Sequence, residues 1–169
     1  MTHKPDPRRQ MQGAVARELG KSFEARIDLS LRWYRAKGLA LVEKTPEPMR
    51  VIRSIGGGRF EACFEHKAQP DYSGVVRGGL AVAFEAKYTT TEKMEQSRVL
   101  PHQADWFDQF SRAGGRCFVM VGFRSGAVYR IPWDVWSDMP TLYGRKYIKE
   151  TDIQAYRVRE TNRGVLKLL

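Results

Sequence analysis

The chain has little cysteine and no long apolar run. Its two cysteines, Cys63 and Cys117, stand in 169 residues with neither a Cys-x-x-Cys pair nor a Cys/His cluster. This excludes a disulfide framework and gives no zinc-site pattern. No stretch approaches the roughly 18 apolar residues of a membrane span, and no apolar segment follows the charged N-terminal residues as in a secretion signal. We therefore expect a cytoplasmic protein without a membrane partner.

Acidic residues are also few relative to basic ones. Lys and Arg number 29 against 19 Asp and Glu, for a formal net charge of +10. Such an excess favours a polyanionic partner, because each neutralised phosphate releases condensed counterions. Charge alone is not specific, since ribosomal, nucleoid and membrane-surface proteins share it. Hydrophobic residues make up 42% of the chain, which excludes a disordered protein and suits one domain with a core.

The spacing of apolar residues predicts an α/β fold. Phe23, Ile27, Leu31 and Tyr34 fall at helical spacing, and Gly38 follows as a stop. Further along, the pattern predicts strands over 39–42, 80–87, 116–123 and 127–131, a helix over 101–113, and a mobile loop over 89–98. This order of elements predicts a mixed β-sheet flanked by helices.

Residues 49–69 do not fit a core layer. Strand-like pairs there are broken by three glycines at 56–58, and basic residues recur throughout the segment. A projecting basic hairpin, or stalk, fits this composition better.

Two carboxylates and a lysine form the most informative pattern. Asp71 is followed fourteen residues later by Glu85, near the end of the alternating run 80–87. Alternate side chains of a strand share a face, so Glu85 and Lys87 point the same way. The turn signal at 77–79 places Asp71 on the neighbouring arm of a hairpin. The pattern therefore predicts a site with two acids and one ammonium group.

Such a set suits metal-assisted hydrolysis of a phosphodiester. Mg²⁺ takes hard oxygen ligands and keeps several waters, so Asp71 and Glu85 are its candidate ligands. Lys87 would place a cation against the charge that develops on the phosphate. Glu24 and Gln103 each lie beside the apolar stripe of a predicted helix and extend the candidate site.

The same residues also have simpler interpretations. A Glu-x-Lys pair on a strand is usually a solvated face with a cross-strand ion pair. Glu24 alone is more often a helix-edge carboxylate, and Gln103 more often a polar residue at a helix N-terminus. The hairpin distance to Asp71 and the basic balance of the chain favour the functional interpretation.

Six short motifs follow one another between about residues 13 and 135. They are Gly20-x-x-Phe23-Glu24, Lys44-x-Pro46-x-Pro48, Asp71-Tyr72-x-Gly74, Phe84-Glu85-Ala86-Lys87, His102-Gln103 and Gly114-Gly115-x-Cys117-Phe118. In order and spacing this set resembles the RecU-type Holliday junction resolvases, a branch of the PD-(D/E)xK nuclease superfamily. The resemblance implies a restriction-endonuclease-like fold and a homodimeric, Mg²⁺-dependent endonuclease, with Mn²⁺ as a substitute metal. It would cut four-way DNA junctions by symmetric nicks in recombination and repair, and a recombinase is a further candidate partner.

Roles carry over from the family by position. Asp71, Glu85 and Gln103 match metal-binding places, Lys87 matches the transition-state stabiliser, and Glu24 matches an acidic position of the first helix. Gln69 stands where the family usually has a threonine ligand. The candidate DNA contacts are Arg50, Arg53, Arg59, Phe64, Lys67 and Tyr72.

The polar, proline-bearing first dozen residues and the extent of the resemblance divide the chain. We expect a flexible basic arm over 1–12, a nuclease domain over 13–140 that includes the stalk at about 49–69, and a basic C-terminal extension over 141–169. Two alternatives stay open. One is another PD-(D/E)xK nuclease of restriction-like or phage type, and the other is a noncatalytic junction-binding accessory protein of recombination.

Overall fold

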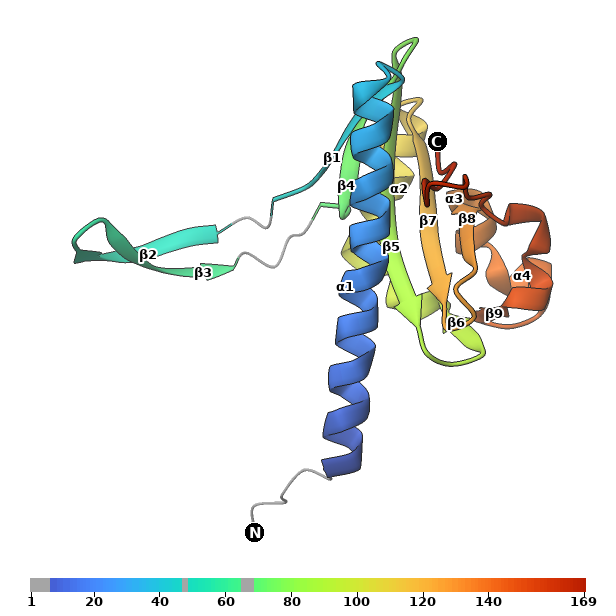
Figure 1. Cartoon of the computed structure of the whole chain (residues 1–169), viewed down its shortest axis with the longest axis horizontal. Coiled ribbons are helices and arrows are strands. Elements are labelled where there is room, and N and C mark those ends of the chain that lie inside the picture. Colours follow the sequence, from blue (N-terminus) through green and yellow to red (C-terminus); the bar gives the residue numbers. More distant parts are fainter. Residues whose placement is uncertain (1–6, 47–48, 65–68) are drawn as a thin grey trace.

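The computed structural model describes residues 7–46, 49–64 and 69–169, which form a sheet with helices on both faces and a projecting hairpin (Figure 1). The helices are α1 (Pro7–Ala36), α2 (Pro101–Arg112), α3 (Trp133–Ser137) and α4 (Met139–Tyr143), with single 3-10 turns η1 (Gln96–Arg98), η2 (Glu150–Asp152) and η3 (Gln154–Tyr156). The strands are β1 (Ala40–Lys44), β2 (Met49–Gly56), β3 (Arg59–Phe64), β4 (Tyr72–Val76), β5 (Leu80–Thr89), β6 (Lys93–Glu95), β7 (Arg116–Phe123), β8 (Val128–Pro132) and β9 (Tyr147–Lys149). The predicted mixed sheet flanked by helices is confirmed. Of the helices in the described ranges, none is long and apolar enough to cross a membrane.

The central sheet has the strand order β1-β4-β5-β7-β8. Among the strands that the structure describes, β5 and β7 alone run parallel. Parallel strands cannot be joined by a tight turn, and the connection between these two contains β6, η1 and α2. Along β5, Phe84 packs in the core under α1, whereas Ala83 belongs to the core under α2. The predicted alternation of β5 is therefore confirmed, and both faces of the sheet are covered.

Helix α1 lies across one face of the sheet and extends beyond it toward the N-terminus (Figure 1). Phe23, Ile27 and Leu31 are buried against the sheet. Burial of each side chain stabilises the folded state by about 1.5–3 kcal/mol. The helix begins at Pro7, so the flexible arm predicted over 1–12 is corrected for residues 7–12, while 1–6 lie outside the described residues. Proline suits the first helical turn, and the Arg, Gln and Met that follow favour helix.

The loop predicted over 89–98 is correct for residues 90–92 and wrong for 89 and 93–98. Strand β5 continues to Thr89, and β6 pairs antiparallel with β9. Met94 is 1% exposed, and the hydroxyls of Thr89 and Thr91 both donate to the carbonyl oxygen of Lys93. Because the partner strand β9 lies far along the chain, local sequence did not reveal this pairing.

The C-terminal residues pack against the rest of the chain. Ile148 and Ile153 are fully buried in the core under α2, and Leu166 and Leu168 in the core under α1. Residues 141–169 therefore complete both cores. The domain boundary near residue 140 stays a prediction.

The stalk is the hairpin of β2 and β3, which projects away from the body (Figure 1). Every residue of β2 is exposed, and glycines with positive φ form the turn at 56–58. The stalk leaves the body between β1 and β4, two strands that pair with each other. The prediction of a projecting hairpin is confirmed for residues 49–64.

Candidate active site

Asp71 and Glu85 meet across the β4–β5 hairpin. The register that pairs Tyr72 with Phe84 places Asp71, just before β4, opposite Glu85. The backbone N–H of Asp71 donates to Glu85 Oε2 at 3.1 Å, and the backbone N–H of Ala86 donates to Asp71 Oδ2 at 2.9 Å. Each carboxylate is thus held by the backbone of the other arm, which fixes their separation.

The Glu85 carboxylate is buried and fully engaged. Its side chain is 1% exposed, and Glu85 Oε1 accepts hydrogen bonds from Lys87 Nζ at 2.7 Å and Gln103 Nε2 at 2.6 Å. A buried carboxylate requires such charge-assisted partners, since an isolated one would be strongly destabilising. Gln103 is itself fixed, because its Oε1 accepts the backbone N–H of Leu100 at the start of α2.

The surroundings of Asp71 change its acidity. Burial and the charge of Glu85 raise the pKa of Asp71 to about 6, against the opposing effects of the Ala86 N–H and Lys87. We call the place where Asp71, Glu85 and Lys87 meet the corner. Its two carboxylates repel each other, and a shared cation removes that repulsion. The corner therefore favours a bound divalent ion.

The donor set at this corner fits Mg²⁺. Carboxylate oxygens from Asp71 and Glu85 are hard ligands, and Mg²⁺ commonly binds one or two carboxylates plus waters and substrate phosphate. Among residues 7–46, 49–64 and 69–169, no three His, Cys, Asp or Glu side chains form a ready-made metal cluster. The carbonyl of Gln103 is engaged by Leu100, and Gln69 is exposed, so direct ligation by either stays a prediction.

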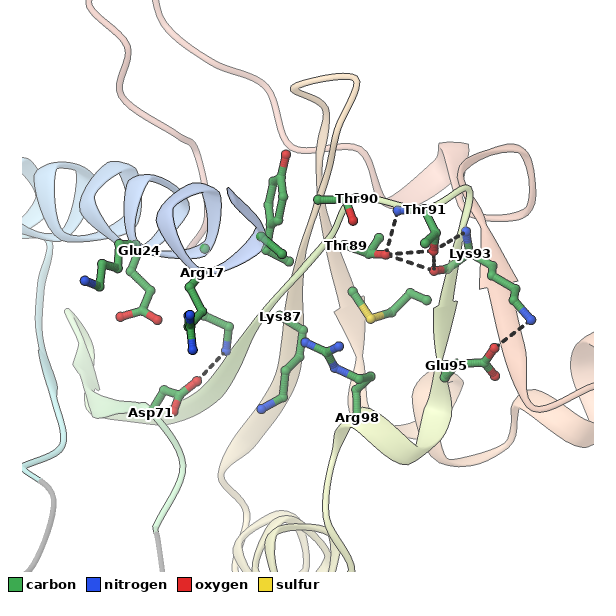
Figure 2. A pocket seen from close by; sticks show the side chains of 16 residues that line it. Arg17, Glu24, Asp71, Lys87, Thr89, Thr90, Thr91, Lys93, Glu95 and Arg98 are labelled. Atoms are coloured by element: carbon green, nitrogen blue, oxygen red, sulfur yellow. Dashed lines mark hydrogen bonds and ion pairs between the residues drawn. The ribbon is translucent and has the colours of Figure 1, made fainter. Parts of the chain in front are cut away.

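Asp71 and Lys87 open into a groove of about 730 Å³ between α1 and the β5–β6 segment (Figure 2). Glu24 also lines this groove, and its Oε2 lies 2.5 Å from Lys44 Nζ. The hydrogen bond from Lys44 to Glu24 raises the pKa of the lysine. Glu24 is therefore beside the corner but already paired with a cation.

The predicted DNA contacts differ in their accessibility. Arg50, Arg53 and Arg59 are exposed on the stalk, where Arg53 pairs with Glu61. The side chains of Phe64 and Lys67 lie outside the described residues. The basic surface predicted for the stalk is present in the described part.

The prediction of Tyr72 as a DNA contact is wrong. Tyr72 is 0% exposed, stacks on Phe84 with ring centroids 4.7 Å apart, and donates its hydroxyl to Asp28 Oδ1 at 2.9 Å. Alternation along β4 sends Tyr72 to the face under α1, opposite to that of Asp71. Its role is to pack the core and tie β4 to α1.

Sequence reasoning missed the basic residues of the groove. Arg17 and Lys21 line it from α1, and Arg98 lines it from η1. Lys21 and Arg17 precede Glu24 by three and seven residues, so helical periodicity could have placed them on the same stripe. No comparable local signal existed for Arg98, which reaches the groove through tertiary packing.

A family model and several curated relatives match this chain, and they point to one family. A family model described as Recombination protein U matches residues 18–168. A Holliday junction resolvase RecU from Streptococcus gordonii is 34% identical over 112 residues, 63% of this chain and 56% of that protein. Proteins of the same name from Bacillus pumilus and Shouchella clausii are 30% and 31% identical, over 79% and 80% of this chain and 69% of each relative.

The chain spans little more than half of the Streptococcus relative's length, at 56%. Among solved structures, that of Hjc, a Holliday junction resolvase from the archaeal hyperthermophile Archaeoglobus fulgidus, matches with 16% identity and a TM-score of 0.47. That match covers 80% of this chain and 88% of the Hjc chain.

Proposed function

The chain belongs to the RecU family of recombination proteins, and from this premise we propose that it is a Mg²⁺-dependent endonuclease that resolves four-way DNA junctions. The observation that carries the proposal is the corner in which Asp71, Glu85 and Lys87 converge at the end of a basic groove. Two carboxylates beside an ammonium group suit phosphodiester hydrolysis and have no evident purpose in packing. The relatives' name, Holliday junction resolvase, indicates the substrate.

The residues of the corner have distinct tasks. Asp71 and Glu85 would hold Mg²⁺, with Mn²⁺ as a substitute, and the ion when bound supplies charge neutralisation and activation of water. Lys87 pairs with Glu85 Oε1 and faces the groove, where its ammonium group would oppose negative charge on the phosphate. Gln103 fixes the orientation of Glu85, so that the site is formed before DNA arrives.

The substrate also suggests an assembly. A four-way junction has approximate two-fold symmetry, so a homodimer would present two identical sites to two strands. The exposed stalk would contact the open centre of the junction with its arginines and apolar side chains. We propose this dimer and a cytoplasmic location, and contact with a recombinase stays a prediction from the family.

The test is cleavage of a synthetic four-way junction with Mg²⁺ by the wild type and by Asp71→Asn. We expect paired symmetric nicks from the wild type and none from the variant, with binding retained by both. Equal nicking by the two proteins would rule out the metal-binding role of Asp71.

Substrate choice separates the two alternatives. Equal cutting of linear duplex, flap and junction would indicate a different nuclease of the superfamily. Tight junction binding without cutting, with either Mg²⁺ or Mn²⁺, would indicate a noncatalytic accessory protein.

A further inference from the structure

The groove continues well past the catalytic corner. From Asp71 and Lys87 it runs between one stripe of α1 and the segment from the end of β5 to η1 (Figure 2). The stripe of α1 that lines it consists of Ala16, Arg17, Gly20, Lys21 and Glu24. The part of the groove beyond the corner has no task in the chemistry described so far.

Gly20 is an unexpected residue on that stripe. A glycine inside a helix costs about 1 kcal/mol relative to alanine. A Cβ at Gly20 would meet no atom within 4 Å, so the packing of the protein does not require glycine there. The open space beside Gly20 is the groove, and a missing side chain lets a ligand's backbone come close to the helix.

The cations of the groove fall into two groups. Lys87 and Lys93 pair with Glu85 and Glu95. In the ranges that the structure describes, Arg17, Lys21 and Arg98 form no ion pair. Arg17 reaches in from α1 and Arg98 from the opposite wall (Figure 2). The walls therefore offer uncompensated positive charge to an extended anion.

Resting on the proposed nuclease function, we propose that this groove, the strand groove, binds the sugar–phosphate backbone of the cut DNA strand on one side of the scissile phosphate. Arg17, Lys21 and Arg98 contact phosphates, and Gly20 admits the backbone. The groove is continuous with Asp71 and Lys87, so a strand lying in it delivers its next phosphate to the corner. An elongated basic groove of this kind positions DNA without reading its bases.

The salt dependence of junction binding tests the three cations. A triple variant with Arg17→Ala, Lys21→Ala and Arg98→Ala is compared with a control carrying Arg32→Ala, Lys37→Ala and Arg112→Ala. The control residues are exposed, lie outside the groove and carry the same total charge. With a chelator present, we expect the slope of log K against log salt to become shallower by about 2 to 3 in the groove variant only.

Equal slopes for the two triple variants would overturn the strand groove. Cleavage by the wild type is measured in parallel, so that the two proposals fail separately. A wild type that neither binds nor cuts junctions sinks the proposed function and the groove with it. A wild type that cuts, beside a groove variant with unchanged slope and rate, sinks the groove alone.

Gly20 has a matched control in Gly13. Gly13 lies on the same helix, outside the groove, and a Cβ there also meets nothing within 4 Å. We expect Gly20→Leu and Gly13→Leu to unfold at temperatures no lower than the wild type, because each gains helix propensity. Only Gly20→Leu should weaken junction binding and slow single-turnover cleavage, each by tenfold or more. Wild-type cleavage by Gly20→Leu would contradict a close approach of DNA at this position.

Discussion

The stalk and the catalytic corner are neighbours in sequence but are built in opposite ways. In the stalk all of β2 is exposed, and among the described residues 49–64 it is held by pairing with β3 and by the Arg53–Glu61 ion pair. In the corner Glu85 is 1% exposed and accepts hydrogen bonds from Lys87, Gln103 and the backbone of Asp71. The corner is fixed by the core, whereas the described part of the stalk is held by contacts within the hairpin.

This difference corresponds to two tasks. Hydrolysis requires charged groups that are held in place before the substrate arrives, and burial with hydrogen bonds provides that. The stalk instead exposes Val51, Ile52, Ile55 and Phe60, each more than half exposed, which the fold does not need on its surface. An isolated two-stranded hairpin is only marginally stable, so the stalk gains from a partner that covers it.

The largest expected effect comes from the corner. Replacing Glu85 with Gln removes the charge that pairs with Lys87 while keeping the size of the side chain. We expect single-turnover cleavage to fall by at least about a thousandfold, about 4 kcal/mol, with junction binding retained. Glu43→Gln, an exposed carboxylate paired with Arg35, is the control and should cut normally. If Glu85→Gln cleaves at a rate within tenfold of the wild type, the corner is not the preorganised catalytic region that we contrast with the stalk.

The next effect concerns stability and pH. The pKa of Asp71 is raised to about 6 from 3.8, so the folded state holds the proton more tightly than the unfolded state. The resulting stabilisation is complete below about pH 4 and is lost as pH rises through 6. We measure the free energy of unfolding in urea with a chelator present. The value for Asp71→Asn should exceed that of the wild type by about 2–3 kcal/mol at pH 7.5, and by little at pH 4. If the free energies of unfolding of the two proteins differ by the same amount at every pH, ionisation of Asp71 does not destabilise the fold.

Substitutions in the stalk should change DNA recognition and leave stability unchanged. Changing Ile52, Ile55 and Phe60 to Ser leaves the free energy of unfolding nearly unchanged, because these side chains are already exposed. We expect the preference for junction over linear duplex to fall about tenfold, about 1.4 kcal/mol, in competitive binding. Leu142→Ser, an exposed leucine of α4, serves as the control for lost apolar surface. An undiminished preference would leave the stalk without a role in recognition.

The smallest effect is expected at the boundary between the regions. Tyr72→Phe removes the hydroxyl that donates to Asp28 and keeps the stacked ring. We expect a loss of about 1 kcal/mol in the free energy of unfolding and wild-type junction binding. Weaker junction binding with an unchanged free energy of unfolding would indicate that the Tyr72 hydroxyl contacts DNA after all.

Sequence reasoning succeeded where the pattern was local. The spacing of Phe23, Ile27 and Leu31 marked the helix, and the alternation around Phe84 marked the strand. The hairpin turn between Asp71 and Glu85 was local too, so their meeting could be predicted. It failed for 93–95, since β6 is a strand only through its pairing with β9.

The sequence by itself determined the alternation, the hairpin and the charge of the corner, because these depend on residue types a short distance apart. Only the tertiary structure decided that Gln103 would hold Glu85, that Tyr72 would turn inward, and that Arg98 would face α1 across the groove. Those outcomes depend on how distant elements pack, and packing is set by the whole core rather than by any one segment.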